Sequence, residues 1–438
     1  MIALAVTFFA PHPGFGSQDF YPGDYSQQAI IGNSLPGTWR PFSDDSPWNT
    51  TISPDAVIHP DNDQIMATVV SEAAKLRLAN RYMPPVWVVN SDNLPHHIAD
   101  SPYPFDTWDQ NLDGITEAGV PITTTMFGEN TPDGHISIVD PFKKLAWEMS
   151  RYTGIVNGVI DCSTFNIWDL TGKGVGDGNE GVRWRARGGR GSGFPIIAGL
   201  IRPEELAAGE IRHALIFTFS KNRRGQYLPP AARTDGKFAG SQYPMEGMLL
   251  QLDPALTDSD FDRWGLNREG KILARALQRY GMYNGDNGGA MALQVQLLHS
   301  SKREHRAIWE SHFSGFYDNI KKIPTDRFRV IYTGKPVTGG ARSTVVSPLI
   351  LPLGGPATGD TVVVTVSTPT RGARITYTTD GSSPDESSTP YAGRLKIHGP
   401  ITIKARAFGS GKTPSSVTRA LFGEKPGPRP APSIPLDN

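Results

Sequence analysis

The sequence has very little cysteine, no net charge and no long apolar run. Cys162 is the one cysteine among 438 residues, so no disulfide can form within the chain. Lysine plus arginine and aspartate plus glutamate number 43 each, so attraction of the whole chain to nucleic acid or anionic membranes is not expected. After the N-terminus, no stretch reaches the ~18 apolar residues that a membrane span needs. We therefore expect no nucleic-acid partner and no membrane span.

Two local runs bear on localisation and partners. Residues 1–10 are apolar and end in a small residue, which fits the core of a truncated signal peptide, although no basic segment precedes it. We treat 1–36 as an N-terminal extension. A run of arginines interrupted by glycine is interpreted as a solvated loop rather than as an RNA-binding segment; its members are Arg183, Arg185, Arg187 and Arg190.

Abundant glycine and proline, 47 and 37 residues, indicate a β-rich chain with many loops. Apolar residues at helical spacing predict few helices; we place them at 63–78, 203–208 and 267–279. Short β-branched or alternating segments predict strands at 86–89, 135–139, 196–200, 211–219, 248–252, 291–298 and 328–332. The expected fold class is mainly β, with a jelly-roll-like sandwich with a few short helices at 37–333.

A second, smaller domain follows a linker at 334–346. Strands predicted at 361–367, 374–378, 394–397 and 401–407 indicate an Ig-like sandwich over 347–423, with a proline-rich tail at 424–438. Its motifs are Ile-Thr-Tyr-Thr-Thr-Asp-Gly-Ser-Ser-Pro (375–384), Ser-Ser-Thr-Pro-Tyr (387–391) and Ile-Thr-Ile-Lys-Ala-Arg-Ala (401–407). The segment resembles the chitobiase/β-hexosaminidase C-terminal domain. That resemblance implies an extracellular carbohydrate-active context and leaves the chemistry to the large domain.

The large domain carries its own set of motifs: Ser-Pro-Trp-Asn (46–49), Asp-Gly-His (133–135), Gly-Ser-Gly (191–193), Ala-Gly-Leu-Ile-Arg (198–202), Arg-Thr-Asp-Gly (233–236) and Arg-Ala-Leu-Gln-Arg-Tyr-Gly-Met-Tyr (275–283). It resembles an uncharacterised family of bacterial secreted proteins, and that resemblance implies a jelly-roll-like, carbohydrate-active domain. Residues 278–283 are also similar to one strand of alginate-lyase-like jelly rolls. The other two signatures of those lyases have no clean match, so their catalytic roles are not carried over.

Acidic residues at strand ends or in glycine-flanked loops are the candidates for chemistry. Hydrolysis of a glycosidic bond needs one carboxyl group as acid and a second as base or nucleophile, and the candidates are Asp133, Asp169, Glu246 and Asp286. Aromatic residues near them in sequence offer faces for sugar stacking; they are Trp168, Trp184, Tyr243, Tyr280 and Tyr283. Each acid alone is also typical of a turn or a cap.

Other chemistries stay open on the same residues. Eliminative cleavage would need a base and a neutraliser of the uronate, which His135, His213, Arg279, Tyr280 and Tyr283 offer. His213 also fits an inward-facing core position, so His135 is the better site candidate. The histidines lack the spacing typical of zinc sites, and no metal or other cofactor is expected for catalysis.

One loop suits a structural calcium ion, although it departs from the EF-hand register; the possible ligands are Asp169, Asp177, Asn179 and Glu180. We expect a secreted, monomeric polysaccharide-active protein, with a glycoside hydrolase as the first hypothesis. A polysaccharide lyase and a non-catalytic carbohydrate-binding or cell-surface protein are the alternatives.

Overall fold

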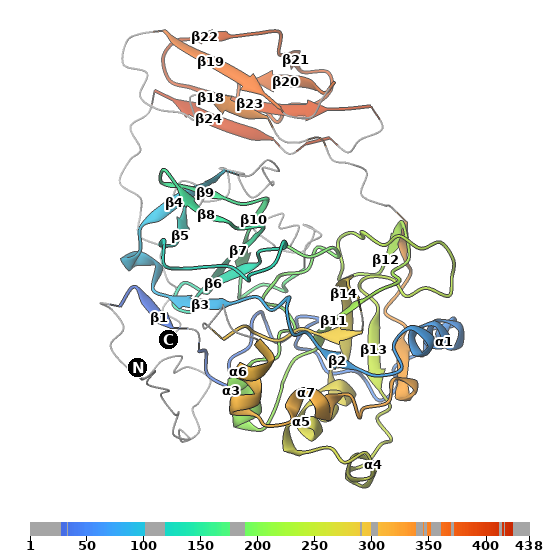
Figure 1. Ribbon diagram of the computed structural model, residues 1–438. Helices are drawn as coiled ribbons and strands as arrows, with labels where there is room; N and C mark the ends of the chain where they lie inside the picture. The colour runs from blue at the N-terminus through green and yellow to red at the C-terminus, as the bar shows by residue number, and fades with distance from the viewer. Residues whose placement is uncertain are drawn as a thin grey trace, which may run out of the picture.

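The computed structural model describes residues 28–32, 34–100, 119–175, 189–289, 291–298, 305–338, 345, 348–351, 361–368, 372–410, 414–415 and 417–423. Strands predominate in it, and the expected mainly-β class is confirmed (Figure 1). The α-helices are short: α1 (Asn62–Glu72), α3 (Pro203–Ala208), α4 (Asp258–Arg263), α5 (Arg268–Arg279), α6 (His305–His312) and α7 (Phe316–Ile320). Among the described residues, none of these helices is long and apolar enough to cross a membrane.

Two large sheets build the first domain. The five-stranded sheet has the order β1 (Ile30–Gly32), β3 (Val86–Val89), β6 (Ile136–Asp140), β7 (Leu145–Ser150) and β10 (Thr164–Asp169). The six-stranded sheet has the order β16 (Phe328–Ile331), β13 (Leu249–Leu252), β14 (Met282–Asn287), β11 (Leu215–Phe219), β15 (Ala292–Leu293) and β2 (Arg77–Leu78). Both sheets are mixed, because β3 pairs with β6 and β11 pairs with β14 in parallel. The finer jelly-roll connectivity stays a prediction.

Smaller sheets complete the domain. One has the order β5 (Val120–Pro121), β4 (His96–Asp100), β9 (Val159–Asp161) and β8 (Gly154–Val156). The other pairs β12 (Gln226–Tyr227) with β17 (Val337–Thr338). Because β17 lies in the expected linker, its pairing with β12 attaches the start of that linker to the large domain. Likewise β1, from the expected N-terminal extension, pairs with β3.

Alternating side chains place the large sheets in layers. In β3, Val86 and Val88 join the core shared with the six-stranded sheet, whereas Trp87 and Val89 join the core shared with β4, β5 and β9. The opposite face of the six-stranded sheet packs against α1, α5 and α7. This sandwich layering follows from the period of two, because central strands such as β3, β6 and β13 bury both of their faces.

One predicted strand is absent, and the reason is local. Residues 196–200 are buried but form bends and turns rather than a strand. The backbone N–H groups of Ile196 and Ile197 both donate to the carboxylate of Glu148, at 2.6 Å each. A buried side chain thus takes the hydrogen bonds that a neighbouring strand would otherwise accept.

The C-terminal domain is a two-sheet sandwich, as expected. One sheet contains β18 (Leu349–Leu351), β19 (Val362–Ser367) and β22 (Leu395–Ile397). The other contains β21 (Thr389–Pro390), β20 (Arg374–Thr378), β23 (Ile401–Phe408) and β24 (Thr418–Phe422). Their inward residues, such as Val364 and Ile403, form a core of their own.

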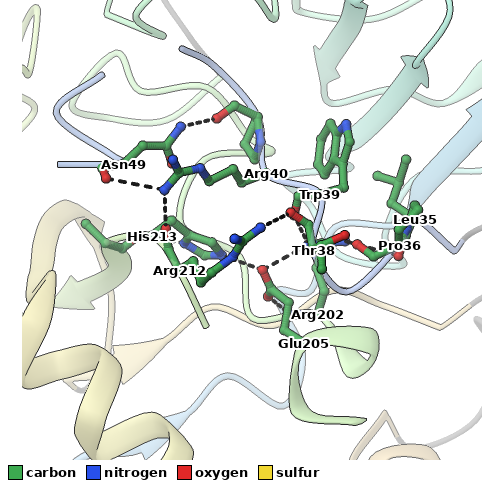
Figure 2. A network of polar contacts seen from close by, with 12 residues as sticks. Leu35, Pro36, Thr38, Trp39, Arg40, Asn49, Arg202, Glu205, Arg212 and His213 are labelled. Carbon is green, nitrogen blue, oxygen red and sulfur yellow. Dashed lines mark hydrogen bonds and ion pairs between the residues drawn. The ribbon is translucent and has the colours of Figure 1, made fainter. Parts of the chain in front are cut away.

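A buried polar network joins α3 to the chain segment before the first helix (Figure 2). Glu205 accepts hydrogen bonds from Arg202 Nη2 and His213 Nε2, each at 2.9 Å. Arg202 also donates to the carbonyl of Trp39 at 2.5 Å. All three residues are at most 3% exposed. His213 is therefore a satisfied core histidine, and its place in the network identifies it as a structural residue.

Candidate functional site

Two acidic groups lie on either side of residues 189–191. In the first, the His135 group, atoms of Glu129, Asp133 and His135 all lie within 4.8 Å of one another. In the second, the Asp286 group, the same holds for Asp235, Glu246 and Asp286. The structure thus gathers into two groups the predicted site residues Asp133, His135, Glu246 and Asp286. We call the two groups with residues 189–191 the Arg190 site.

The segment between the groups leaves room for both. A Cβ atom on Gly191 would lie 2.5 Å from Asp235 Oδ1 and 2.8 Å from Asp286 Oδ1. A Cβ atom on Gly189 would lie 3.8 Å from His135 Cδ2. Glycine at position 191 therefore lets both carboxylates lie close to the loop backbone, since a real Cβ does not come so near another heavy atom.

Arg190 itself is buried, at 2% exposure, which corrects its interpretation as part of a solvated loop. Its guanidinium group donates to the carbonyl of Ile196 at 2.9 Å. Burial lowers the pKa of Arg190, and Asp286, Glu148, Glu129 and Asp133 oppose that effect through their charges. Arg190 is thus a buried cation among carboxylates of both groups.

A bulge in the sheet aims Asp286 into the site. Along the parallel pair of β11 and β14, Phe217 lies opposite Asn284 and Thr218 lies opposite Asp286, so Gly285 is skipped. A Cβ atom on Gly285 would lie 2.3 Å from the side chain of Ile216. Bulges change the direction in which the next side chain points. Here the bulge places Asp286 beside Gly191, while Ser192 Oγ ties the loop to the Gly285 carbonyl at 2.6 Å.

Glu246 forms the buried floor of the Asp286 group. It is 0% exposed, and its Oε2 accepts a hydrogen bond from the backbone N–H of Asp235 at 3.0 Å. Its Oε1 is buried and has no hydrogen-bond partner among the described residues. Asp235 is exposed and Asp286 is half-buried. The two aspartates are therefore the members of this group that a substrate can reach.

Two members of the Asp286 group, Asp286 and Glu246, have raised pKa values. Burial raises the pKa of Asp286 to about 6, with Asp235 adding to the rise and Arg190 and His135 opposing it. Burial also raises the pKa of Glu246 well above its usual range, and the charge of Asp235 adds to that rise. Perturbed acids of this kind are typical of proton-transfer sites.

Several residues predicted for the site lie elsewhere. Asp169 ends β10, and its Oδ1 accepts hydrogen bonds from the N–H and the hydroxyl of Thr171, at 2.8 and 2.6 Å. That pattern is a self-contained turn. Trp168, Tyr280 and Tyr283 are at most 5% exposed and belong to the core between the large sheets. Other side chains cover them in this structure, and their use as sugar-stacking faces stays a prediction.

The remaining predicted residues divide into two sets. Arg279 is exposed and pairs with Glu210 at 2.5 Å on the outer surface of α5, beside a hollow of about 850 Å³. Tyr243 is half-buried against the ring of Phe238, at 5.2 Å between centroids, and stays a candidate. The rest lie outside the described residues: Trp184, Asp177, Asn179 and Glu180.

Sequence reasoning missed three members of the site. Asp235 has the same signal as Asp133, an aspartate directly before glycine, and lies in the Arg-Thr-Asp-Gly motif. Glu129 and Arg190 gave no local signal, because only the fold brings each of them to a partner. For a metal ion, the oxygens of the Asp286 group are the best-placed donors, and such a set suits hard cations. In the His135 group, Nδ1 of the imidazole is already bonded to Glu129.

Comparison with known proteins identifies one part of the chain. Residues 352–419 match the chitobiase/beta-hexosaminidase C-terminal domain family. No curated protein matches the chain. The C-terminal domain is therefore of the family that its sequence resembles, and the chain carries a domain of a carbohydrate-active family.

Proposed function

We propose that the protein is a secreted polysaccharide-active enzyme that hydrolyses glycosidic bonds at the Arg190 site. The observation that carries the proposal is the Asp286 group, in which carboxylate oxygens lie within 4.8 Å of one another. The matched C-terminal domain supports a carbohydrate substrate and an extracellular location. Both expectations come from the domain family rather than from the large domain.

Asp286 acts as the general acid and base, and Asp235 acts as the nucleophile. Asp286, whose pKa is raised to about 6, donates its proton to the leaving glycosidic oxygen. Asp235 attacks the anomeric carbon, and the bond to the leaving sugar breaks. Water, deprotonated by Asp286, then displaces Asp235 and completes the hydrolysis. Enzymes that retain the anomeric configuration keep their carboxyl groups about 5 to 5.5 Å apart, so the short spacing of this group favours retention.

Glu246 and the His135 group support this pair. Glu246 is fully buried, so it acts on Asp235 and Asp286 rather than on the sugar. After burial, the charges of Asp235 and Asp286 raise the pKa of Glu246 further, because like charges at short range disfavour each other. Asp133, in the His135 group, is exposed.

The test is a screen of reducing-end release over a panel of neutral, amino and uronate polysaccharides. Three proteins are compared: wild type, Asp286→Asn, and Asp169→Asn as a matched aspartate outside the site. We expect release by wild type and Asp169→Asn, and a loss of about 10²- to 10⁴-fold in Asp286→Asn. Binding without release would support a carbohydrate-binding protein instead, and unsaturated uronate products would support a lyase. Either result overturns the proposal.

A further inference from the structure

The closest ionic contact of the site joins Glu129 to His135. Glu129 Oε1 lies 2.9 Å from His135 Nδ1, and the two residues are 4% and 7% exposed. The backbone reinforces the contact, because the N–H of Glu129 donates to the carbonyl of His135 at 2.8 Å. A carboxylate at this distance accepts a hydrogen bond from Nδ1–H. Nε2 is then the ring nitrogen that Glu129 does not contact.

The loop between the two residues folds Glu129 back onto His135. Gly134 adopts φ +48°, and its N–H donates to the carbonyl of Thr131 at 3.1 Å. The hydroxyl of Thr131 donates to the same Oε1 of Glu129 at 3.0 Å. Two donors thus fix one oxygen, while Oε2 is buried without a hydrogen-bond partner among the described residues. The carboxylate is held in place for His135 rather than for solvent.

The charges around His135 come from three directions. Burial disfavours the imidazolium, but Glu129 outweighs burial through its charge and hydrogen bond, so the pKa of His135 is raised above its ordinary value. Arg190 opposes the rise and Asp286 assists it. Asp133 is the remaining charged neighbour, within 4.8 Å of both members of the pair. His135 therefore connects the two acidic groups electrostatically.

We propose that Glu129 is a positioning residue of the site: its carboxylate holds the Nδ1 proton of His135 and fixes the ring, so that Nε2 is left to form a hydrogen bond with a sugar hydroxyl. This inference rests on the proposed hydrolysis for the identity of the acceptor. The holding of the Nδ1 proton is independent of the reaction. A hydrogen bond from a charged imidazolium to a hydroxyl oxygen is stronger than one from a neutral donor.

The experiment follows the imidazole nitrogens of His135 by NMR across a pH titration, with His135→Asn used to assign the signals. In wild type we expect His135 to titrate above 6.5, its ordinary value, with the proton on Nδ1 in any neutral fraction. Glu129→Gln keeps the shape and an acceptor but removes the charge, so the midpoint should fall by about 1 unit or more. Glu210→Gln, a surface glutamate, should leave it unchanged.

Activity separates this inference from the proposed function. On a cleaved polysaccharide, Glu129→Gln should raise KM or lower kcat/KM by about tenfold and shift the loss of activity to lower pH, since one charged hydrogen bond is weakened. A shifted titration without cleavage of any polysaccharide would overturn the hydrolase and leave the positioning role in place. An unchanged His135 midpoint in Glu129→Gln, or a wild-type midpoint below 6.5, would overturn the inference.

Discussion

Two sites in the molecule each contain a buried arginine, a buried glutamate and a buried histidine. Around Glu205, both carboxylate oxygens are used, since Oε1 accepts from Arg202 and His213 and Oε2 accepts from the Arg202 backbone. Around Arg190, the buried oxygens Glu246 Oε1 and Glu129 Oε2 have no hydrogen-bond partner among the described residues. Both carboxylate oxygens of Glu205 are hydrogen-bonded. Glu246 and Glu129 each have one oxygen that is hydrogen-bonded and one that is not.

The difference separates stability from chemistry. A buried polar group that is fully paired holds elements together, whereas an unpaired one costs free energy. The Glu205 network joins α3 to the segment around Trp39 and gives no substrate access. The Arg190 site has exposed members, Asp133 and Asp235, above its buried ones. If the two groups respond to substitution in the same way, they do not differ in role.

The largest effect is expected from breaking the satisfied network. Glu205→Ala leaves Arg202 and His213 buried without their shared partner, so the free energy of unfolding should fall by about 3 to 5 kcal/mol. Chemical denaturation measures the loss. Glu210→Ala, which removes an exposed ion pair with Arg279, should cost no more than about 1 kcal/mol. Equal losses would contradict the structural role of Glu205.

A smaller effect is expected from crowding the site. Gly191→Ala places a methyl group against Asp235 and Asp286, so the carboxylates must move apart and kcat should fall by at least about tenfold. Gly289→Ala is the matched control, because a Cβ there meets nothing within 4 Å. The ratio of the two rates on a cleaved polysaccharide is the measurement. Full activity in Gly191→Ala would show that the close spacing has no role.

The pH dependence of stability offers a third comparison. The pKa of Asp286 is raised from 3.8 to about 6 in the fold, so the neutral form is favoured and its contribution is complete at low pH. That contribution is lost as pH rises through about 6. We expect the free energy of unfolding of wild type, relative to Asp286→Asn, to fall between about pH 4 and 7. A flat difference would place Asp286 in an ordinary environment.

The smallest effect is expected from chelation. The hydrolysis proposed for the Arg190 site uses carboxyl groups alone, so incubation with EDTA followed by desalting should leave kcat unchanged. Activity and melting temperature are measured on the same sample. A loss that Ca²⁺ or Mn²⁺ restores would mean that the oxygens of the Asp286 group hold a cation instead of sharing protons.

Local sequence signals predicted much of this, within limits that the structure explains. The strand at 86–89 and the helix near 267–279 were predicted closely, because their apolar periods are strong. The strand predicted at 196–200 failed because Glu148, distant in sequence, takes its N–H groups. Aspartates beside glycine pointed to the site, since such loops bring carboxylates to strand ends. The arginine run predicts a solvated loop, yet Arg190 is buried. Contacts between segments distant in sequence decide burial, and local composition does not show them.

The most direct test of the comparison is the free energy of unfolding of Glu246→Gln at pH 8, measured beside Glu205→Gln. Glutamine keeps the shape of Glu246 and an acceptor for the Asp235 N–H, and it is neutral at a position where burial and the charge of Asp235 disfavour an ionised carboxylate. We predict that Glu246→Gln is at least as stable as wild type while Glu205→Gln is less stable. A loss of stability in Glu246→Gln as large as that in Glu205→Gln would contradict the account.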